Sequence, residues 1–327
     1  MNVETADKTS SPLSVGLDEV KAAALRIARF AHTTPVMTNP HLDALARCRL
    51  FFKCENLQTA GAFKVRGAAN AVLSLDAADL LNGVATHSSG NHAAALSYVA
   101  QQLHVSAHVV MPENASAAKV AAVRAYGGHI TFCAPTIAAR QATLDRVCKT
   151  TGALPIPPFD DLRIIAGQGT CALELVSQLA LAPDSLVVPV GGGGLISGCG
   201  VVSAALWTAT RVVGAEPAGA AYAAQSLALG ALQPQVAPQT VADGLRAAPG
   251  GTTFSIMQRT VHAVHTVEDD AIVDAMRLLW MHLKVVVEPS AAVGLAVVLA
   301  NARHFEGQRV CIVLSGGNVD IDALPWC

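Results

Sequence analysis

Short apolar runs rich in β-formers alternate with alanine-rich helical stretches, and this alternation constrains the fold most. Seven runs have the composition of strands, namely RLFFKCE, GVATHS, SAHVVMP, HITFCAP, SLVVPVG, RVVGAEP and RVCIVLSGG. Helical stretches such as HAAALSYVAQQL and TCALELVSQLAL lie between them, and an amphipathic helix, LDEVKAAALRIARF, precedes them and ends before Pro35. Apolar strands that alternate with helices predict an α/β protein whose parallel sheets are covered on both faces.

The length of 327 residues permits one large domain or two ordinary ones. Residues 83–153 contain several strand–helix units of their own, bounded by LDAADLLNG and TTGALPIPP. We therefore predict a smaller domain at 83–153 inserted in a large domain formed by residues 1–82 and 154–327. The polar residues 1–15 are expected to be a loose tail.

The composition argues against macromolecular and membrane functions. Lys plus Arg is 22 against 24 for Asp plus Glu, so no basic surface for nucleic acid or anionic membrane is expected. The apolar runs are broken before the roughly 20 residues that a membrane span requires. The eight cysteines form no Cys-x-x-Cys pair and the N-terminal stretch has no apolar signal sequence, which favours free thiols and a cytoplasmic protein.

Ligands of α/β sheets bind where the carboxyl ends of strands lead into helices, and one such end here is unusually polar. The strand GVATH is followed by Ser88, Ser89, Gly90, Asn91 and His92. These groups can cap the following helix, but three polar donors around a glycine exceed that need. They favour a site for a carboxylate.

Two other strand ends carry glycines. Gly191 to Gly194 let the backbone fold closely around an anion, which favours a phosphate site. A dinucleotide site with Glu216 as the ribose-binding acid is the rival interpretation, although the glycines are contiguous rather than spaced as G-x-G-x-x-G. Ser315 follows an apolar strand and precedes Gly316. Its hydroxyl can form a hydrogen bond either with a nearby backbone group or with a ring nitrogen of a planar cofactor.

Lys64 lies among small or apolar residues in the stretch AGAFKV. Loss of solvation lowers the pKa of a lysine, which suits a lysine that forms a Schiff base. Taken alone, a structural lysine is the simpler interpretation.

Together, the blocks HTTPV, FFKCENLQ, AFKVRGAANAV, THSSGNH, IAGQGT, VPVGGGG, VADG, EPSAAVG and LSGGNVD resemble the fold type II (β-family) pyridoxal-phosphate enzymes. The similarity is greatest to the serine/threonine dehydratase and serine racemase group, and it covers nearly the whole chain. It implies two parallel-sheet α/β domains with the cofactor in the cleft between them, the small domain being mobile. It also implies a homodimer that acts on small amino acids.

The resemblance further implies roles for cofactor-binding residues. Lys64 would form a Schiff base with pyridoxal phosphate, and Phe63 would pack beside its ring. Asn91 would bind the 3′-oxygen and Ser315 would face the pyridine nitrogen. The phosphate would lie in the loop Gly191, Gly192, Gly193 and Gly194.

The substrate would be held by the loop after the strand GVATH. The resemblance assigns its carboxylate to Ser88, Ser89, Asn91 and His92, and Ser89 would also lie across the cofactor from Lys64. Arg140 would either contact a substrate carboxylate when the small domain moves over it, or be a surface residue without such a role.

The implied reaction is elimination of water from a β-hydroxy amino acid such as L-serine or L-threonine, which gives a 2-oxo acid and ammonia. Lys64 would take the α-proton. Serine racemase activity, with Ser89 as the second acid, stays open, as does a dehydratase for 3-hydroxyaspartate or for a bulkier substrate such as phenylserine. Two other classes of protein are less well supported. A catalytically inactive protein that only binds an amino acid or cofactor would be expected to lack one of the implied site residues. A nicotinamide oxidoreductase would have no use for Lys64.

The chain departs from the resemblance at several positions. Ala62 stands where serine is usual, and Ala93 to Ala95 stand where a glutamine helps to bind nucleotide, so nucleotide activation is not expected. Related dehydratases hold a metal through an acid at the position of Glu216 and a second acid where this chain has Tyr222. A neutral phenol is a poor ligand for Mg²⁺ or Ca²⁺, so we predict weak or no activation by divalent cations. Glu288 is a further candidate for a position near the cofactor.

Overall fold

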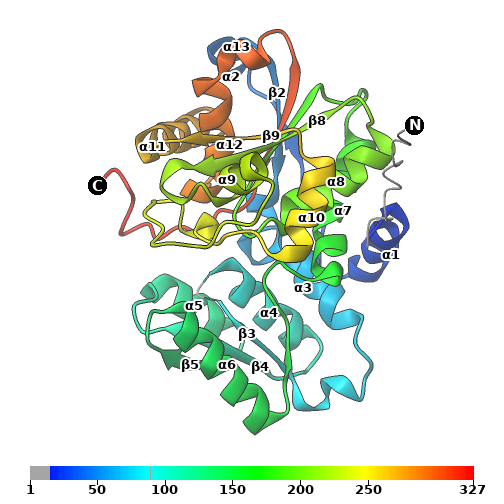
Figure 1. Cartoon of the computed structure of the whole chain (residues 1–327), viewed down its shortest axis with the longest axis vertical. Helices are drawn as coiled ribbons and strands as arrows, with labels where there is room; N and C mark the ends of the chain where they lie inside the picture. The colour runs from blue at the N-terminus through cyan, green and yellow to red at the C-terminus, as the bar shows by residue number, and fades with distance from the viewer. Residues whose placement is uncertain (1–14, 89) are drawn as a thin grey trace, which may run out of the picture.

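The computed structural model describes residues 15–88 and 90–327, which form two lobes, each built on one sheet (Figure 1). The sheet of the large lobe has the strand order β1-β2-β10-β7-β8-β9, and only β1 is antiparallel to its neighbour. Its strands are β1 (Val36–Met37), β2 (Arg49–Cys54), β7 (Ser185–Pro189), β8 (Arg211–Pro217), β9 (Ala263–Val267) and β10 (Arg309–Leu314).

Helices cover both faces of this sheet. Along β7, Leu186 and Val188 join one buried cluster and Val187 joins another, because successive side chains point to opposite faces. The helices of this lobe are α1 (Leu17–Ile27), α2 (Pro40–Ala46), α3 (Lys64–Leu73), α7 (Leu162–Gln178), α8 (Gly194–Leu206), α9 (Tyr222–Leu229), α10 (Gly251–Thr260), α11 (Asp269–Leu278), α12 (Pro289–Ala300) and α13 (Ala302–Phe305).

The small lobe, at the bottom of Figure 1, has a fully parallel sheet in the order β5-β4-β3-β6. Its elements are β3 (Val84–His87), α4 (Asn91–Gln102), β4 (Ala107–Pro112), α5 (Ala117–Ala125), β5 (His129–Cys133), α6 (Ile137–Thr151) and β6 (Leu154–Pro155). The sheet thus continues to residue 155, past the predicted boundary at residue 153. The mobility of this lobe stays a prediction.

The structure confirms the α/β class and all seven predicted strands. It adds β1 and β6, which are too short to show a pattern, and β9, which carries His265. The predicted tail lies outside the described residues up to residue 14, whereas Val15 is buried. All eight cysteines are free and six are buried. Within residues 15–88 and 90–327, no helix has the length and apolar character to cross a membrane.

A buried ion network fixes helix α3 beneath the cleft. Arg66, only 1% exposed, donates from Nε to Glu55 at 2.7 Å and from Nη1 to Glu174 at 2.7 Å. Lys53 adds a bond from Nζ to the same Glu174 carboxylate at 2.5 Å. Burial by itself raises the pKa of the Glu55 carboxyl, but the Arg66 guanidinium holds this pKa below its ordinary value. The network therefore joins β2, α3 and α7 through charges that are fully paired.

We predict that Arg66→Ala lowers the free energy of unfolding by about 3–5 kcal/mol, because it leaves the Glu55 carboxylate buried without its partner. Urea denaturation followed by circular dichroism measures this change. The control is Arg309→Ala, which breaks a partly exposed pair with Asp184 and should cost no more than about 1 kcal/mol. Equal losses in the two variants would contradict the role given to the network.

Candidate active site

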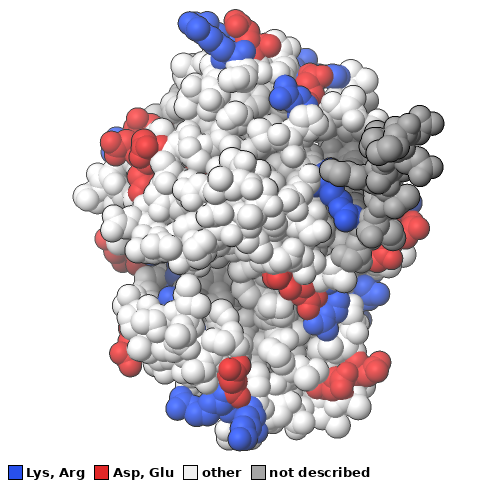
Figure 2. Space-filling model, in the orientation of Figure 1, with Lys and Arg blue, Asp and Glu red and all other residues white. Residues whose placement is uncertain are grey.

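The predicted site residues converge where the large sheet meets the small lobe. The loop before Lys64 lies against the loop after β10: Phe63 N–H donates to the Ser315 carbonyl at 3.1 Å, and Gly317 N–H donates to the Gly61 carbonyl at 2.9 Å. Asn318 Nδ2 donates to Asn91 Oδ1 at 2.9 Å, which brings the start of α4 to the same place. Figure 2 shows that the surface is hollowed between the lobes.

Lys64 begins α3 at the base of this cleft. Its Nζ donates to the Pro158 carbonyl at 2.8 Å and lies 5.1 Å from the centre of the Phe63 ring. Burial lowers the pKa of its ammonium to about 8, against an opposing effect of Glu288. About a tenth of the amine is therefore neutral at pH 7 and about half at pH 8, and this neutral form is the one that a nucleophilic or basic lysine requires.

The glycine loop has room for backbone only. A Cβ on Gly192 would lie 2.2 Å from the ring of Phe159, and Gly193 has a φ of +85°. Helix α8 begins at Gly194, so its positive end and free N–H groups lie directly behind the loop. This arrangement is suited to a phosphate group, and the binding of a phosphate there stays a prediction.

Glu288, a candidate from the sequence, holds Asn91 in place, a contact that the sequence did not predict. Its Oε1 accepts a bond from Asn91 Nδ2 at 2.8 Å, and its side chain is buried. Burial raises the pKa of Glu288 to about 7, although Lys119, Asn91 and Lys64 each lower it. A Cβ on Gly316 would lie 2.7 Å from this carboxylate, which explains the glycine after Ser315.

The residues predicted to bind a substrate carboxylate lie around the start of α4. Ser88 Oγ accepts a weak bond from Gly90 N–H at 3.4 Å, and Ser89 lies outside the described residues. His92 Nε2 pairs with the Ile156 carbonyl at 3.1 Å, so its Nδ1 is left as an acceptor when Nε2 carries the proton. Burial, followed by the charge of Lys64, lowers the pKa of His92 to about 3 and keeps the ring neutral.

Arg140 lies on α6, near the end of β3. Its charge, after burial, contributes to a lowered pKa of His87, the last residue of β3. Arg140 Nε is buried and has no hydrogen-bond partner among residues 15–88 and 90–327. An unpaired donor of a permanently charged group marks a place where an incoming anion would be stabilised.

The residues around Glu216 do not fit a divalent metal ion. Both oxygens of Glu216 accept backbone bonds, from Ala223 N–H at 2.8 Å and Ala224 N–H at 2.9 Å, so the carboxylate caps α9. The Tyr222 hydroxyl donates to the Val236 carbonyl at 2.8 Å. No group of three or more His, Cys, Asp or Glu side chains suited to a metal occurs in the described part of the chain.

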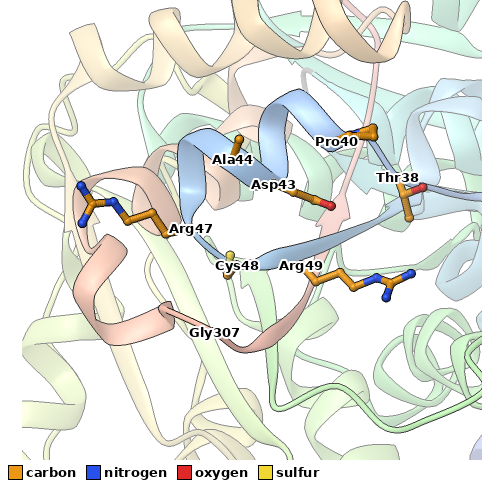
Figure 3. A pocket seen from close by; sticks show the side chains of 8 residues that line it. All are labelled: Thr38, Pro40, Asp43, Ala44, Arg47, Cys48, Arg49 and Gly307. Atoms are coloured by element: carbon orange, nitrogen blue, oxygen red, sulfur yellow. The ribbon is translucent and has the colours of Figure 1, made fainter.

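A separate surface cavity of about 570 Å³ lies beside α2 and is not a site of this kind (Figure 3). Its two arginines, Arg47 and Arg49, point away from one another in the figure. The Asp43 carboxylate already accepts a bond from Leu50 N–H at 2.9 Å. The cavity therefore lacks polar groups that converge on a ligand.

The chain is similar to known pyridoxal-phosphate dependent enzymes. The family model for pyridoxal-phosphate dependent enzymes matches residues 27–316. The β-hydroxyaspartate dehydratase of Paracoccus denitrificans (strain Pd 1222) is 48% identical over 309 residues, which cover 94% of this chain and 98% of that protein. The structure of maize serine racemase is 44% identical with a TM-score of 0.92, over 94% of this chain and 95% of that one. The structure of the threonine deaminase from T.th. is 40% identical with a TM-score of 0.89, over 94% and 99% of the two chains.

We predict that the rate at which the apoprotein binds added pyridoxal phosphate covalently rises with pH and levels off above about pH 8, the pKa of Lys64. Below that pH the ammonium form has no lone pair for attack on the aldehyde, so the rate falls. Stopped-flow absorbance of the visible Schiff-base band measures it, and Lys64→Ala is the control that should give no band. A rate that keeps rising toward the ordinary lysine pKa of 10.5 would contradict the desolvated environment.

Removal of divalent cations by chelation, followed by titration with Mg²⁺, should leave both the melting temperature and the activity unchanged. The physical reason is that the oxygens of Glu216 and the hydroxyl of Tyr222 are already engaged with backbone groups. Differential scanning fluorimetry and a 2-oxo acid assay measure the two properties. A saturable rise in either with Mg²⁺ would show that a metal displaces these contacts.

Proposed function

Since this chain belongs to the pyridoxal-phosphate-dependent enzyme family, we propose that it is a dehydratase that removes water from 3-hydroxyaspartate and yields oxaloacetate and ammonia. Pyridoxal phosphate is the cofactor of the family, and the family match sets aside the dinucleotide interpretation of the glycine loop. The more general activity, dehydration of a β-hydroxy amino acid, draws support from the Paracoccus dehydratase and the threonine deaminase as relatives.

The residues described above would hold the cofactor. Lys64 would bind it covalently, the loop from Gly191 to Gly194 would receive its phosphate, and Asn91 and Ser315 would contact its ring. When bound, the cofactor supplies an electron sink for the electrons released at the α-carbon of the substrate.

The chain's own groups would then move the protons. Lys64 Nζ, neutral in part because its pKa is about 8, takes the α-proton, and the Pro158 carbonyl orients this amine. The bond from the β-carbon to the hydroxyl breaks, and the hydroxyl leaves as water with the proton that Lys64 took from the α-carbon, which returns Lys64 to its neutral form. The enamine product rearranges to an imine, which water hydrolyses to the 2-oxo acid and ammonia.

The observation that carries the choice of substrate is Arg140. Its buried Nε has no described partner, and it lies beside the loop predicted to bind the α-carboxylate. A monocarboxylic substrate such as serine has no further charge for this guanidinium, whereas 3-hydroxyaspartate brings a second carboxylate. Arginine is suited to that contact because its charge is permanent and its donors match a carboxylate.

Serine racemase activity is the second candidate, and the similarity to the maize racemase supports it. It requires an acid opposite Lys64, predicted to be Ser89, which lies outside the described residues. L-serine, L-threonine and phenylserine are therefore compared with 3-hydroxyaspartate below. The homodimer rests on the family resemblance, and the cytoplasmic location draws support from the free, mostly buried cysteines.

We predict that kcat/KM for elimination is at least about tenfold higher with 3-hydroxyaspartate than with L-serine, as one charge-assisted contact implies. Arg140→Met should lower kcat/KM for 3-hydroxyaspartate by about 10–100-fold and change that for L-serine little. A coupled assay for 2-oxo acid, run with all isomers of 3-hydroxyaspartate, measures these values.

The matched control is Arg146→Met, a substitution of an exposed arginine elsewhere on the same helix, which should leave both substrates unaffected. Formation of D-serine from L-serine without 2-oxo acid would replace the proposal by the racemase. Turnover of phenylserine in preference to 3-hydroxyaspartate would leave the dehydratase standing and reject the role of Arg140.

A further inference from the structure

An ion pair links the two lobes of the chain. Lys119, in the first turn of α5 of the small lobe, contacts the carboxylate of Asp243. Asp243 begins the short helical turn Asp243–Leu245 of the large lobe. The pair therefore links two segments that belong to different sheets and different lobes.

The two charged groups are bonded to one another and to no third side chain in the described part of the chain. Within residues 15–88 and 90–327, the Lys119 ammonium and the Asp243 carboxylate make no further hydrogen bond. Their side chains are 23% and 36% exposed, in contrast to Arg66 and Glu55, which are 1% and 0% exposed and bonded at several atoms. Water reaches both groups, so this pair can open and close while the Arg66 network cannot.

The position of Lys119 indicates that its charge serves a purpose outside its own helix. A cation in the first turn of a helix opposes the helix dipole, and Ser116 already caps α5 through the Lys119 N–H. Burial lowers the pKa of Lys119, while the neighbouring Glu288 raises it and Arg246 lowers it. Glu288 is the residue that holds Asn91, so Lys119 lies close to the cofactor-binding groups.

Asp243 is attached to the other side of the same site. The next residue, Gly244, donates its N–H to Ser290 Oγ at 3.0 Å, at the start of α12. Leu245 packs against the glycine loop, since a Cβ on Gly191 would lie 3.1 Å from its Cα. The ion pair thus connects α5 to the segment that supports the phosphate loop.

We propose that Lys119 and Asp243 are positioning residues that clasp the small lobe over the cleft while the substrate reacts, an inference that rests on the proposed dehydratase activity. Opening of the pair admits substrate and releases product. Its closing brings the substrate-binding residues of α4 and α6 against the cofactor side and excludes water. A weak, solvent-accessible pair suits this role because it must break once in every turnover.

The test uses the holoenzyme with Lys119→Met, Asp243→Asn and the charge-exchanged double variant Lys119→Asp/Asp243→Lys. Each single variant should lower kcat/KM by about fivefold, the effect of a partly exposed pair, and the charge-exchanged variant should recover most of it. Salt at about 0.5 M should lower kcat/KM of the wild type by a larger factor than that of Lys119→Met, because the contact of Arg140 with the substrate is screened in both proteins and the ion pair only in the wild type. Amide hydrogen exchange of α5 should be faster in both single variants and normal in the charge-exchanged one.

The matched control is Asp184→Asn, which breaks the similarly exposed pair with Arg309 at the amino ends of β7 and β10, away from the cleft. It should change neither kcat/KM nor exchange of α5. Wild-type behaviour of both single variants would overturn the proposal, as would a charge-exchanged variant that is as slow as Lys119→Met, because Lys119 would then act without Asp243. If no β-hydroxy amino acid is dehydrated by the wild type, the proposed function fails, and hydrogen exchange still decides whether the clasp exists.

Discussion

The buried guanidinium of Arg66 is the interaction on which the rest of the site depends. It is bonded to carboxylates from two other elements, and it lies two residues after Lys64 on the same helix. Val65, Ala69 and Val72 of α3 pack in one cluster with buried residues of the small lobe such as Leu96 and Val99. One helix therefore fixes the lysine, anchors it to the large sheet and provides the surface against which the small lobe is placed.

Burial gives the site its electrostatic character. It moves the pKa of Lys64 down to about 8 and that of His92 down to about 3, and it moves that of Glu288 up to about 7. Each of these shifts favours the neutral form of the group. At pH 7 the His92 ring is therefore neutral and the Glu288 carboxyl is about half protonated, whereas most of Lys64 still carries its proton. Together with Arg140 and Lys119 of the small lobe, Lys64 gives the cleft a positive character that suits the phosphate and carboxylates of its ligands.

The sequence allowed the strands to be predicted where they are apolar on both faces, as β7 and β10 are, because that pattern arises only inside a covered parallel sheet. Strands β1 and β6 have two residues each and leave no such pattern. Within the site, the glycine loop and Lys64 were predictable because their chemistry is local. Glu288 was only a candidate, since its contact with Asn91 joins residues 197 apart in the chain. The contact of Lys64 with the Pro158 carbonyl and that of Lys119 with Asp243 also join residues far apart in the sequence, so neither could be predicted from it. The roles assigned to individual site residues stay predictions that the substitutions above would test.

The two lobes are expected to have different tasks, since most cofactor-binding residues lie in one and the substrate-binding residues in the other. Lys64, the glycine loop and Ser315 belong to the large lobe and would hold the cofactor, which every member of the family requires. The small lobe contains the residues that would bind the substrate, namely Ser88 to His92 and Arg140. Asn91 is the exception, because it would also contact the cofactor ring. A change of substrate can therefore arise from substitutions elsewhere within residues 84–155 without disturbing the cofactor site or the Arg66 network. This arrangement gives a physical reason why proteins named as a racemase and a deaminase can share this backbone with TM-scores of 0.92 and 0.89. We therefore expect the choice of substrate to depend mainly on the small lobe, while Lys64 of the large lobe would supply the base for the reaction in either case.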